Sequence, residues 1–311
     1  MGASLVITIL LATYNGITYL PDLIASLQSQ TFDDFQVLMR DDLSTDGTPE
    51  YLANVCCGDS RFHLLSPGSH LGASGNFFSL LREAQGYTAF CDQDDVWHPR
   101  RLEACMSRMQ EAESELAPGT PVLVHSDLRI IGPTGVPLHD SFIRYQGWHI
   151  QDTGLNRLLV TNNVTGSSML INDALRSMAV MVDDRKVFMH DWWIAKTCAA
   201  TGVICPLEEP LVDYRQHGDN AVGASSGGTL QRFLSAVTHP DRTRKRVQET
   251  FDEARLLLMT YDALLPPEAK ELLTSFVSIQ TLPKHLRYQK LKQGGFLMPG
   301  AAARLAQALL S

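Results

Sequence analysis

The N-terminal half of the chain alternates between short apolar runs and helical patterns. Four segments have the length of strands, residues 5–11, 35–39, 61–65 and 87–91, and the first is a continuous apolar, β-rich run. Helical patterns lie between them, and the first has a clear apolar face: Leu20, Leu23, Ile24 and Leu27. Continuous apolar runs are typical of strands buried on both faces, and their alternation with helices predicts a mostly parallel central sheet flanked by helices. We therefore expect an α/β fold whose ligands bind beyond the carboxyl ends of the strands.

The pattern becomes less regular from about residue 122. Strand-like runs recur at residues 122–125 and 167–171 and from near Pro210, and a helix is expected to begin near Asp191. Residues 218–228 are rich in glycine and serine, which favours a flexible linker.

Beyond this linker the sequence is helical and basic. Two helical patterns, 247–265 and 272–279, each end before proline. Residues 229–311 hold 12 Lys and Arg against 7 Asp and Glu. We expect an α/β domain over residues 1–225 and a helical C-terminal extension over residues 226–311.

Composition excludes some classes of function. With 26 Lys and Arg against 34 Asp and Glu, the net charge is −8, which argues against electrostatic binding of nucleic acid. No apolar run approaches the roughly 18 residues that cross a bilayer, and the start lacks the basic region of a signal peptide. The six cysteines form no C-x-x-C pair and no zinc spacing, so we expect reduced thiols in a cytoplasmic protein.

The strongest local signal is a group of carboxylates directly after the strand at 87–91. Asp92, Asp94 and Asp95 fall within four residues and repel one another unless a cation joins them. Carboxylate oxygens at a strand end suit Mg²⁺ or Mn²⁺, which keep several waters and also bind phosphate. The alternative is a solvated acidic turn in which an Asp caps the next helix.

A second acidic pair, Asp41-Asp42, ends the strand at 35–39. A carboxylate there can accept hydrogen bonds from a base N–H or from ribose hydroxyls. A simple helix cap explains the same residues equally well.

Two polar motifs follow in the second half. In His190-Asp191-Trp192-Trp193 the tryptophan rings could stack on a sugar, or Asp191 could cap a helix whose tryptophans lie in the core. His217 lies in a glycine-marked loop after a strand, where a histidine is more often structural than a ligand.

Taken together, the motifs resemble those of the family 2 (GT-A type) glycosyltransferases over roughly residues 4–220, most closely the bacterial rhamnosyltransferase-like members. The segments that carry the resemblance are Thr13-Tyr14-Asn15-Gly16, Gln30-Thr31-Phe32, Asp41-Asp42-Leu43-Ser44-Thr45-Asp46-Gly47-Thr48, Asp92-Gln93-Asp94-Asp95-Val96-Trp97, Thr165-Gly166-Ser167-Ser168, His190-Asp191-Trp192-Trp193 and Tyr214-Arg215-Gln216-His217-Gly218. The fold that the resemblance implies is GT-A, over residues 1–225.

The resemblance also implies roles on the donor side. It implies a base pocket at Thr13, Tyr14 and Asn15, with Asp42 holding the N3–H of a pyrimidine. Asp92 and Gln93 belong to the donor site in the same way. Asp94 corresponds to the direct ligand of Mg²⁺ or Mn²⁺, with Asp92 and His217 completing the metal site.

On the acceptor side, the resemblance implies that Asp191 is the general base. Trp192, Trp193, Gly166 and Ser167 are then expected near the acceptor sugar. Two departures touch these contacts: Ser167 stands where close relatives have Cys, and Asp219 where Asn is commoner.

The reaction implied is a single displacement that inverts the anomeric centre. The donor that the resemblance favours is dTDP-L-rhamnose, with UDP-linked hexoses as the alternative. The acceptor would be a hydroxyl of a growing surface glycan or of a lipid-linked glycan.

Three alternatives remain open from the sequence. The Asp-x-Asp after a strand also resembles the nucleophile motif of haloacid-dehalogenase-type phosphatases, although that family carries it on its first strand. A silent sugar- or nucleotide-binding module would lack a base or metal carboxylate, and Asp94 and Asp191 are both present. The basic residues of the extension form either a solvated face or a contact with anionic lipid at the inner membrane surface: Arg242, Arg244, Lys245, Arg246, Lys284, Arg287, Lys290 and Lys292.

Overall fold

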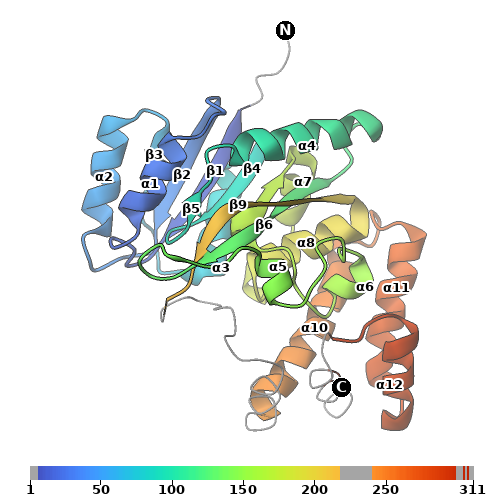
Figure 1. Ribbon diagram of the computed structural model, residues 1–311. Coiled ribbons are helices and arrows are strands. Elements are labelled where there is room, and N and C mark those ends of the chain that lie inside the picture. The colour runs from blue at the N-terminus through green and yellow to red at the C-terminus, as the bar shows by residue number, and fades with distance from the viewer. Residues whose placement is uncertain (1–5, 218–239, 299–303, 305–306, 308–311) are drawn as a thin grey trace.

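The first four strands build the parallel part of a nine-stranded sheet. The computed structural model describes residues 6–217, 240–298, 304 and 307 (Figure 1). The strands are β1 (Ile7–Thr13), β2 (Phe35–Asp41), β3 (Phe62–Leu64) and β4 (Tyr87–Asp92). The helices that connect them are α1 (Leu20–Gln28), α2 (Thr48–Gly58) and α3 (Gly72–Glu83). Strand β1 pairs in parallel with both β2 and β4, so the ends of these strands meet at one edge of the sheet.

The second half of the sheet is mixed. Its strands are β5 (Val96–Trp97), β6 (Val122–Ile131), β7 (Pro137–His139), β8 (Met169–Ile171) and β9 (Val203–Arg215). The spatial order is β3-β2-β1-β4-β8-β6-β9-β5, with β7 beside β6. Strand β8 runs antiparallel to both neighbours, whereas β6 and β9 are parallel. The α/β architecture with flanking helices is therefore as predicted, and its parallel character is concentrated in the N-terminal half.

Side chains alternate across β1 and divide the core in two. Ile7, Ile9 and Leu11 face one cluster, which includes the apolar faces of α1 and of α4 (Arg101–Glu115), while Leu10 faces the other. The second cluster contains α3, α7 (Asp173–Ala179) and α8 (His190–Thr201). The short elements on this half are α5 (Phe142–Tyr145), α6 (Leu155–Leu158), η1 (Gly166–Ser168) and η2 (Asp184–Lys186).

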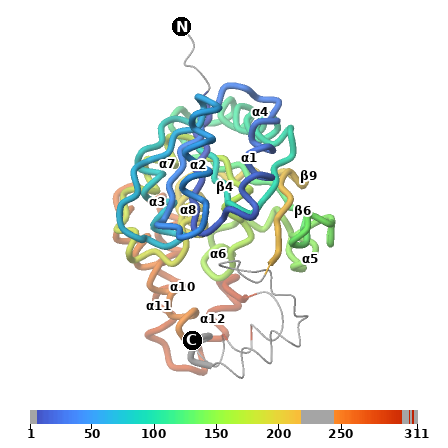
Figure 2. The backbone as a smooth tube through the Cα atoms, turned by 90° about the vertical axis from the view of Figure 1, so that its left-hand side faces the viewer, coloured from blue at the N-terminus to red at the C-terminus, as the bar shows by residue number. Residues whose placement is uncertain are grey.

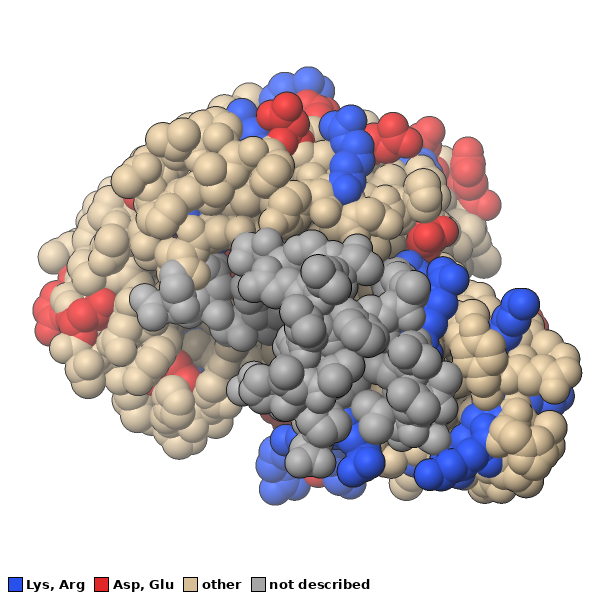
Figure 3. All heavy atoms as spheres, turned by 60° about the horizontal axis from the view of Figure 1, so that its bottom comes forward, with Lys and Arg blue, Asp and Glu red and all other residues tan. Residues whose placement is uncertain are grey.

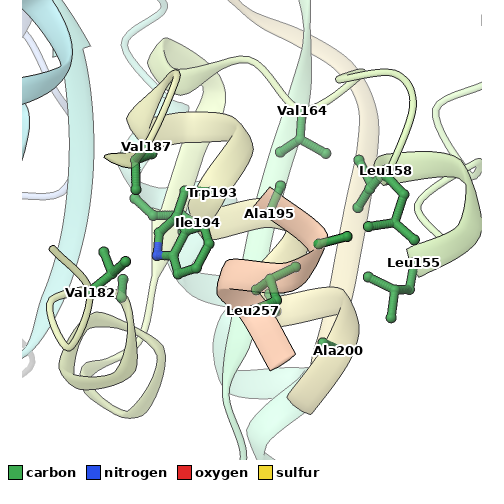
Figure 4. Close-up of a cluster of buried hydrophobic side chains, with 14 of the residues drawn as sticks. Leu155, Leu158, Val164, Val182, Val187, Trp193, Ile194, Ala195, Ala200 and Leu257 are labelled. Atoms are coloured by element: carbon green, nitrogen blue, oxygen red, sulfur yellow. The ribbon is translucent and has the colours of Figure 1, made fainter. Parts of the chain in front are cut away.

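The C-terminal helices share this second core. They are α10 (Pro240–Tyr261), α11 (Pro267–Ser278), η3 (Ile279–Thr281) and α12 (Lys284–Gln293). Leu257 of α10 lies among Trp193, Ile194 and Ala195 of α8 (Figure 4). Figure 2 shows these helices gathered below the sheet. The expected linker 218–228 and the expected boundary after residue 225 lie outside the described residues.

One element boundary differs from the sequence prediction, because β9 begins at Val203, before Pro210. The β6–β9 register shifts beside Asp127, the partner of Pro210. Such an irregularity accommodates a residue that has no N–H to donate. In the described part of the chain, no helix has the length and apolar character needed to cross a membrane.

Candidate active site

The loops after β1 and β2 are joined by side-chain hydrogen bonds to backbone. The amide of Asn15 donates to Ser44 Oγ (2.7 Å), and the Asn15 side chain accepts from the amide of Thr45 (2.8 Å). The amide of Gly16 donates to Thr48 Oγ1 (3.0 Å). Asn15 adopts φ 48°, a conformation that asparagine tolerates better than most residues. These contacts give the predicted donor residue Asn15 a structural part in shaping the loop.

Asp41 and Thr13 also serve the loop. Asp41 accepts hydrogen bonds from Thr13 Oγ1 (3.0 Å) and from the amide (2.8 Å) and hydroxyl (2.5 Å) of Ser44. Thr13 is 1% exposed, so its side chain faces the protein and not an open pocket.

Asp42 is buried beside the start of α3. Its carboxylate accepts hydrogen bonds from Arg40 Nη1 (2.9 Å) and from the amides of Leu71 (2.8 Å) and Gly72 (2.7 Å), and His70 Nδ1 lies 3.0 Å away. Burial alone would raise the pKa of Asp42, but the Leu71, Arg40 and Gly72 hydrogen bonds outweigh it and hold the pKa below its ordinary value. Both oxygens of Asp42 are thus engaged within the protein, and its contact with the N3–H of a pyrimidine stays a prediction.

An exposed aromatic and apolar surface adjoins Asp42. The rings of Tyr14 and His70 lie 5.1 Å apart between centroids. Tyr14, Leu43 and Leu71 are each more than two fifths exposed. An exposed surface of this kind, aromatic and partly apolar, suits a nucleobase.

Gln93 connects the β1 loop to the carboxylate loop. Its side-chain amide accepts from the Tyr14 amide (2.8 Å) and donates to the Tyr14 carbonyl (3.0 Å). A Cβ atom at Gly16 would lie 2.3 Å from Gln93 Oε1, so glycine leaves room for the Gln93 side chain in this position. Gln93 therefore fixes Tyr14 relative to Asp92 and Asp94.

The structure brings Asp94 and His217 together across 123 residues of sequence. His217 Nε2 and Asp94 Oδ2 are 2.8 Å apart. The His217 ring stacks on Tyr19, with 4.7 Å between the centroids, just before α1. Sequence reasoning assigned no role to Tyr19, because nothing in its local motif indicates that it meets a loop so far along the chain.

Arg215 connects the end of β9 to the same loop. Its Nε donates to the Asp94 carbonyl (2.8 Å), and its own amide donates to the Asp95 carboxylate (3.1 Å). Its Nη2 reaches Asp22 on α1 at 3.0 Å. The side chain is 2% exposed, so Arg215 positions the carboxylate loop from inside the protein.

Four carboxyl groups converge here: Asp92, Asp94, Asp95 and Asp191. Burial raises the pKa of Asp92 to about 7, and the negative charges of Asp94 and Asp191 add to the shift. Burial, with the charges of Asp94 and Asp92, raises the pKa of Asp95 well above its ordinary value. Such crowding of negative charge favours a divalent cation at this edge of the sheet.

Asp191 lies in the first turn of α8 and is held from two sides. Its Oδ1 accepts from the Trp192 amide (2.6 Å) and its Oδ2 from Asn162 Nδ2 (3.1 Å). Burial raises the pKa of Asp191 to about 6, against the opposing effects of the Trp192 and Gly166 amides and Asn162. A carboxylate with this pKa is ionised at neutral pH and still basic enough to accept a proton.

The neighbouring tryptophans are core residues. Trp192 is 4% exposed and its Nε1 donates to the Leu158 carbonyl (2.5 Å), while Trp193 is fully buried and stacks against Tyr261. This differs from the expected sugar-stacking surface, because neither ring presents a face to solvent. The alternative that the sequence left open, core aromatics behind a helix start, describes them.

Gly166 lies beside Asp191, and both Gly166 and the following Ser167 are buried. A Cβ at Gly166 would come within 3.1 Å of His190 Nε2 and 3.4 Å of Asp191 Cβ, so this glycine lets η1 approach α8. Arg101 Nη2 donates to the Ser167 carbonyl (2.6 Å), with its guanidinium 3.3 Å above the Trp97 ring. Arg101, like Arg215, contacts the site from inside the protein, and no local sequence motif indicates this role.

The metal-binding atoms available here suit a cation that is bound partly by the protein and partly by a ligand. Among the residues described, no group of three or more His, Cys, Asp or Glu side chains has the arrangement of a metal cage. His217 nevertheless contacts the Asp94 carboxylate, whose charge in turn acts on Asp92. Mg²⁺ and Mn²⁺ sites of enzymes that bind phosphates need only one or two carboxylates, because water and phosphate complete the shell.

The fold and this site define a nucleotide-sugar transferase class of protein, and the comparisons agree. The chain belongs to glycosyl transferase family 2, whose model matches residues 8–177. This assignment decides against the phosphatase alternative and confirms the family that the motifs predicted.

Two bacterial relatives illustrate the range within the family. The dTDP-rhamnosyl transferase RfbG of Shigella flexneri is 30% identical over 230 residues, covering 69% of this chain and 74% of that protein. WfgD of Escherichia coli, a UDP-Glc:α-D-GlcNAc-diphosphoundecaprenol β-1,3-glucosyltransferase, is 33% identical over 104 residues, covering 33% of this chain and 40% of the relative. The chain spans less than half the length of WfgD and of a second curated relative, TuaG of Bacillus subtilis.

Solved structures share the GT-A fold. TarS of S. aureus, in complex with UDP-GlcNAc, has a TM-score of 0.55 and 14% identity, covering 98% of this chain and 90% of that one. The mannosyltransferase PcManGT of Pyrobaculum calidifontis, in complex with GDP-Man and Mn²⁺, has a TM-score of 0.53 and 15% identity, covering 97% and 86%. The GT-A fold expected from the sequence is therefore confirmed.

Proposed function

We propose that the protein is an inverting glycosyltransferase that moves a sugar from a nucleotide diphosphate to an acceptor hydroxyl. The observation that carries the proposal is the convergence of a metal-type carboxylate loop, Asp92 to Asp95, with the separately held carboxylate of Asp191. Sugar transfer needs one group to stabilise the leaving diphosphate and another to take the acceptor proton.

Asp191 is the proposed general base. It removes the proton of the acceptor hydroxyl as that oxygen attacks the anomeric carbon, in a single displacement that inverts the centre. Asn162 orients one oxygen of Asp191, and the Trp192 amide orients the other. Base assistance of this kind contributes about 10²–10⁴-fold to the rate.

Asp94, Asp92 and His217 are the residues proposed to hold Mg²⁺ or Mn²⁺. A cation bound there would neutralise the developing charge of the diphosphate. Arg215 and Tyr19 keep the Asp94 carboxylate and the His217 ring in place for this task.

The proposed base pocket is the exposed surface at Tyr14, His70, Leu43 and Leu71. The loops beneath this surface are held by hydrogen bonds of Thr13, Asn15 and Asp42. Gln93 joins Tyr14 to the carboxylate loop by hydrogen bonds. We favour dTDP-L-rhamnose as donor, supported by the likeness to RfbG over 69% of the chain. A UDP-linked hexose is the second candidate, supported by the likeness to WfgD, a UDP-Glc-dependent glucosyltransferase.

The proposed acceptor is a hydroxyl of a growing surface glycan or of a lipid-linked glycan. Gly166 and Ser167 border the base, and buried Trp192 and Trp193 fix the helix that carries it. All six cysteines are free thiols, which supports a cytoplasmic location.

Peripheral contact with the inner membrane surface is part of the proposal. Helix α12 exposes Lys284, Lys290 and Lys292 together with Leu286 and Tyr288. Figure 3 shows basic side chains gathered over the C-terminal helices. Arg287 is less available for such a contact, because its guanidinium donates to the Leu282 and Gln280 carbonyls. The Arg242 side chain lies outside the described residues.

The test is thermal unfolding with dTDP, UDP, GDP and ADP, each with and without Mn²⁺. A ligand at about 100 times its Kd adds about 2.7 kcal/mol to the free energy of unfolding, which raises the midpoint by several degrees. A shift with dTDP or UDP that requires Mn²⁺ is expected and names the donor class. The absence of a shift with every nucleotide would overturn the proposed function.

A further inference from the structure

A polar cavity of about 570 Å³ lies where α6 meets the segment after α12. Its walls come from residues 147–157 on one side and from Gly295 and Arg304 on the other. None of the proposed donor or metal residues lines it. In Figure 1 the loops after β1 and β2 lie on the left, whereas α6 lies on the right beside the C-terminal helices.

Two guanidinium groups, those of Arg157 and Arg304, line this cavity. Arg157 Nη1 donates to the Leu297 carbonyl (3.4 Å), and Arg304 Nε donates to the neighbouring Met298 carbonyl (3.2 Å). Across the described ranges, neither arginine has a carboxylate within ion-pair distance. Arg157 Nε is buried with no hydrogen-bond partner.

This arrangement concentrates positive charge. Burial lowers the pKa of Arg157, the Asp152 carboxylate opposes that effect, and the charge of Arg304 adds to it. Asp152 and His149 are the other titratable groups of the lining, and both are exposed. Guanidinium groups inside a cavity that are hydrogen-bonded to carbonyls but not paired with a carboxylate favour an anion that can take several hydrogen bonds at once.

The close approach of the two walls depends on a glycine. Gly295 has φ 70°, and a Cβ there would lie 2.5 Å from Asn156 Nδ2. The C-terminal segment can therefore reach the α6 wall and bring Arg304 to the same cavity as Arg157.

The cavity wall also contacts the segment that orients Asp191, the proposed general base. Asn163 Nδ2 donates to the carbonyls of His149 (3.3 Å) and Asp152 (3.1 Å), and its neighbour Asn162 holds Asp191. Leu158, next to Arg157, accepts the Trp192 indole hydrogen bond. The cavity wall is thus connected to Asp191 through the neighbouring residues Asn163 and Asn162.

We propose that Arg157 and Arg304 form a binding site for a phosphate or diphosphate group carried by the acceptor. The inference rests on the proposed function, because it assigns the cavity to the acceptor of that reaction. A phosphate group matches the paired guanidinium donors and would satisfy the buried Nε of Arg157. The bound anion would hold the acceptor so that its hydroxyl lies toward Asp191.

The probe is inorganic pyrophosphate, titrated calorimetrically into the full chain in metal-free buffer with EDTA. Without a cation the carboxylate loop repels anions, so binding under these conditions reports the cavity. The wild type should bind one equivalent, more weakly as salt rises. The double variant Arg157→Gln/Arg304→Gln should bind at least about tenfold more weakly. The variant Arg157→Lys/Arg304→Lys keeps both charges but loses the forked guanidinium donors, so its affinity should lie between those of the wild type and the Gln variant.

A matched control is Arg185→Gln, which removes an exposed arginine of η2 outside the cavity and should leave the pyrophosphate Kd unchanged. An unchanged Kd in the Arg157→Gln/Arg304→Gln variant, or no binding by the wild type, would overturn the proposal. Nucleotide binding in Mn²⁺ is measured on the same proteins. If nucleotide binds and pyrophosphate does not, the cavity assignment fails alone; if nucleotide does not bind, the proposed function fails.

Two further ligands identify the source of the phosphate. Farnesyl diphosphate binding markedly tighter than pyrophosphate, and weakened by the double variant, supports the site and assigns it to a lipid-linked acceptor. Glucose 1-phosphate binding as tightly as farnesyl diphosphate, with the same sensitivity, supports the site and assigns it to a sugar phosphate.

Discussion

Lys196 on α8 and Glu253 on α10 form a buried ion pair between the proposed catalytic helix and the C-terminal helices. Their side chains are 0% and 3% exposed. The Lys196 ammonium also lies 3.7 Å from the centre of the Trp192 ring, and the second oxygen of Glu253 accepts from the Phe188 amide (2.8 Å). Helix α10 therefore holds the segment that carries Asp191 from both ends.

We expect Glu253→Gln to destabilise the protein by about 3–5 kcal/mol, because it leaves the Lys196 charge buried without its partner. The double variant Lys196→Met/Glu253→Met should recover a large part of this loss, since it removes both charges. Urea unfolding measures the difference. Arg185→Gln, at an exposed ion pair, is the control. A loss below about 1 kcal/mol for Glu253→Gln, the range of surface pairs, would contradict this role.

Arg215→Lys is expected to raise the Mn²⁺ concentration that gives half-maximal activity, because lysine cannot contact the Asp94 carbonyl, Pro133 and Asp22 together. Arg129→Lys is the matched control: Arg129, on β6, pairs with the Asp213 carboxylate on β9, at 2.6 and 2.7 Å. Metal titrations of activity compare the two variants. If both shift equally, Arg215 contributes to stability and does not position the loop.

Asp94→Asn and His217→Gln should both weaken the metal dependence of nucleotide binding, Asp94→Asn more strongly because it removes a charge. His98→Gln is the matched control, since His98 Nε2 lies 3.0 Å from Asp213 in a similar pair outside the cluster. Calorimetric titration of dTDP or UDP with and without Mn²⁺ gives the comparison. Unchanged metal dependence in Asp94→Asn would remove Asp94 from the metal site.

His125 makes stability depend on acid. It is fully buried, neither ring nitrogen has a hydrogen-bond partner, and burial lowers its pKa to about 4. Its ordinary value near 6.5 applies in the unfolded chain, so the unfolded state binds a proton first as pH falls. The contribution of neutral His125 to the free energy of unfolding is thus fully present above about pH 6.5. As the pH falls toward 4, this contribution decreases by about 1.4 kcal/mol per pH unit.

We therefore expect His125→Met to lose less stability than the wild type between pH 7.5 and 5.5. Urea unfolding at the two pH values measures this difference, with the exposed His63→Gln as control. Parallel losses in wild type and His125→Met would contradict the assignment.

The sequence predicted the elements that depend on interactions between residues close together in the chain. The strands that end at Thr13, Asp41 and Asp92 have continuous apolar runs, and their polar ends follow from the direction of a parallel sheet. Contacts that join distant segments were not accessible in this way. Arg215 and Tyr19 act on a loop that local patterns do not connect to them.

The tryptophans show a different limit. A His-Asp-Trp-Trp motif fits either an acceptor surface or a core, because α8 is buried on nearly every side and has no polar face to reveal its orientation. Only the packing of α10 against Trp193 decides between them. The same packing explains why a basic, helical stretch that reads as a separate extension shares a core with the catalytic half.

The account depends most directly on Asp191. Transfer by wild type and by Asp191→Asn, measured with the donor identified by nucleotide binding, should differ by at least about 10²-fold in kcat. The Kd for the nucleotide with Mn²⁺ should stay within about threefold. In the wild type, kcat/KM should rise with pH to a plateau above about 6, because the Asp191 carboxylate acts only when ionised. Transfer by Asp191→Asn within about tenfold of the wild type would show that the base lies elsewhere.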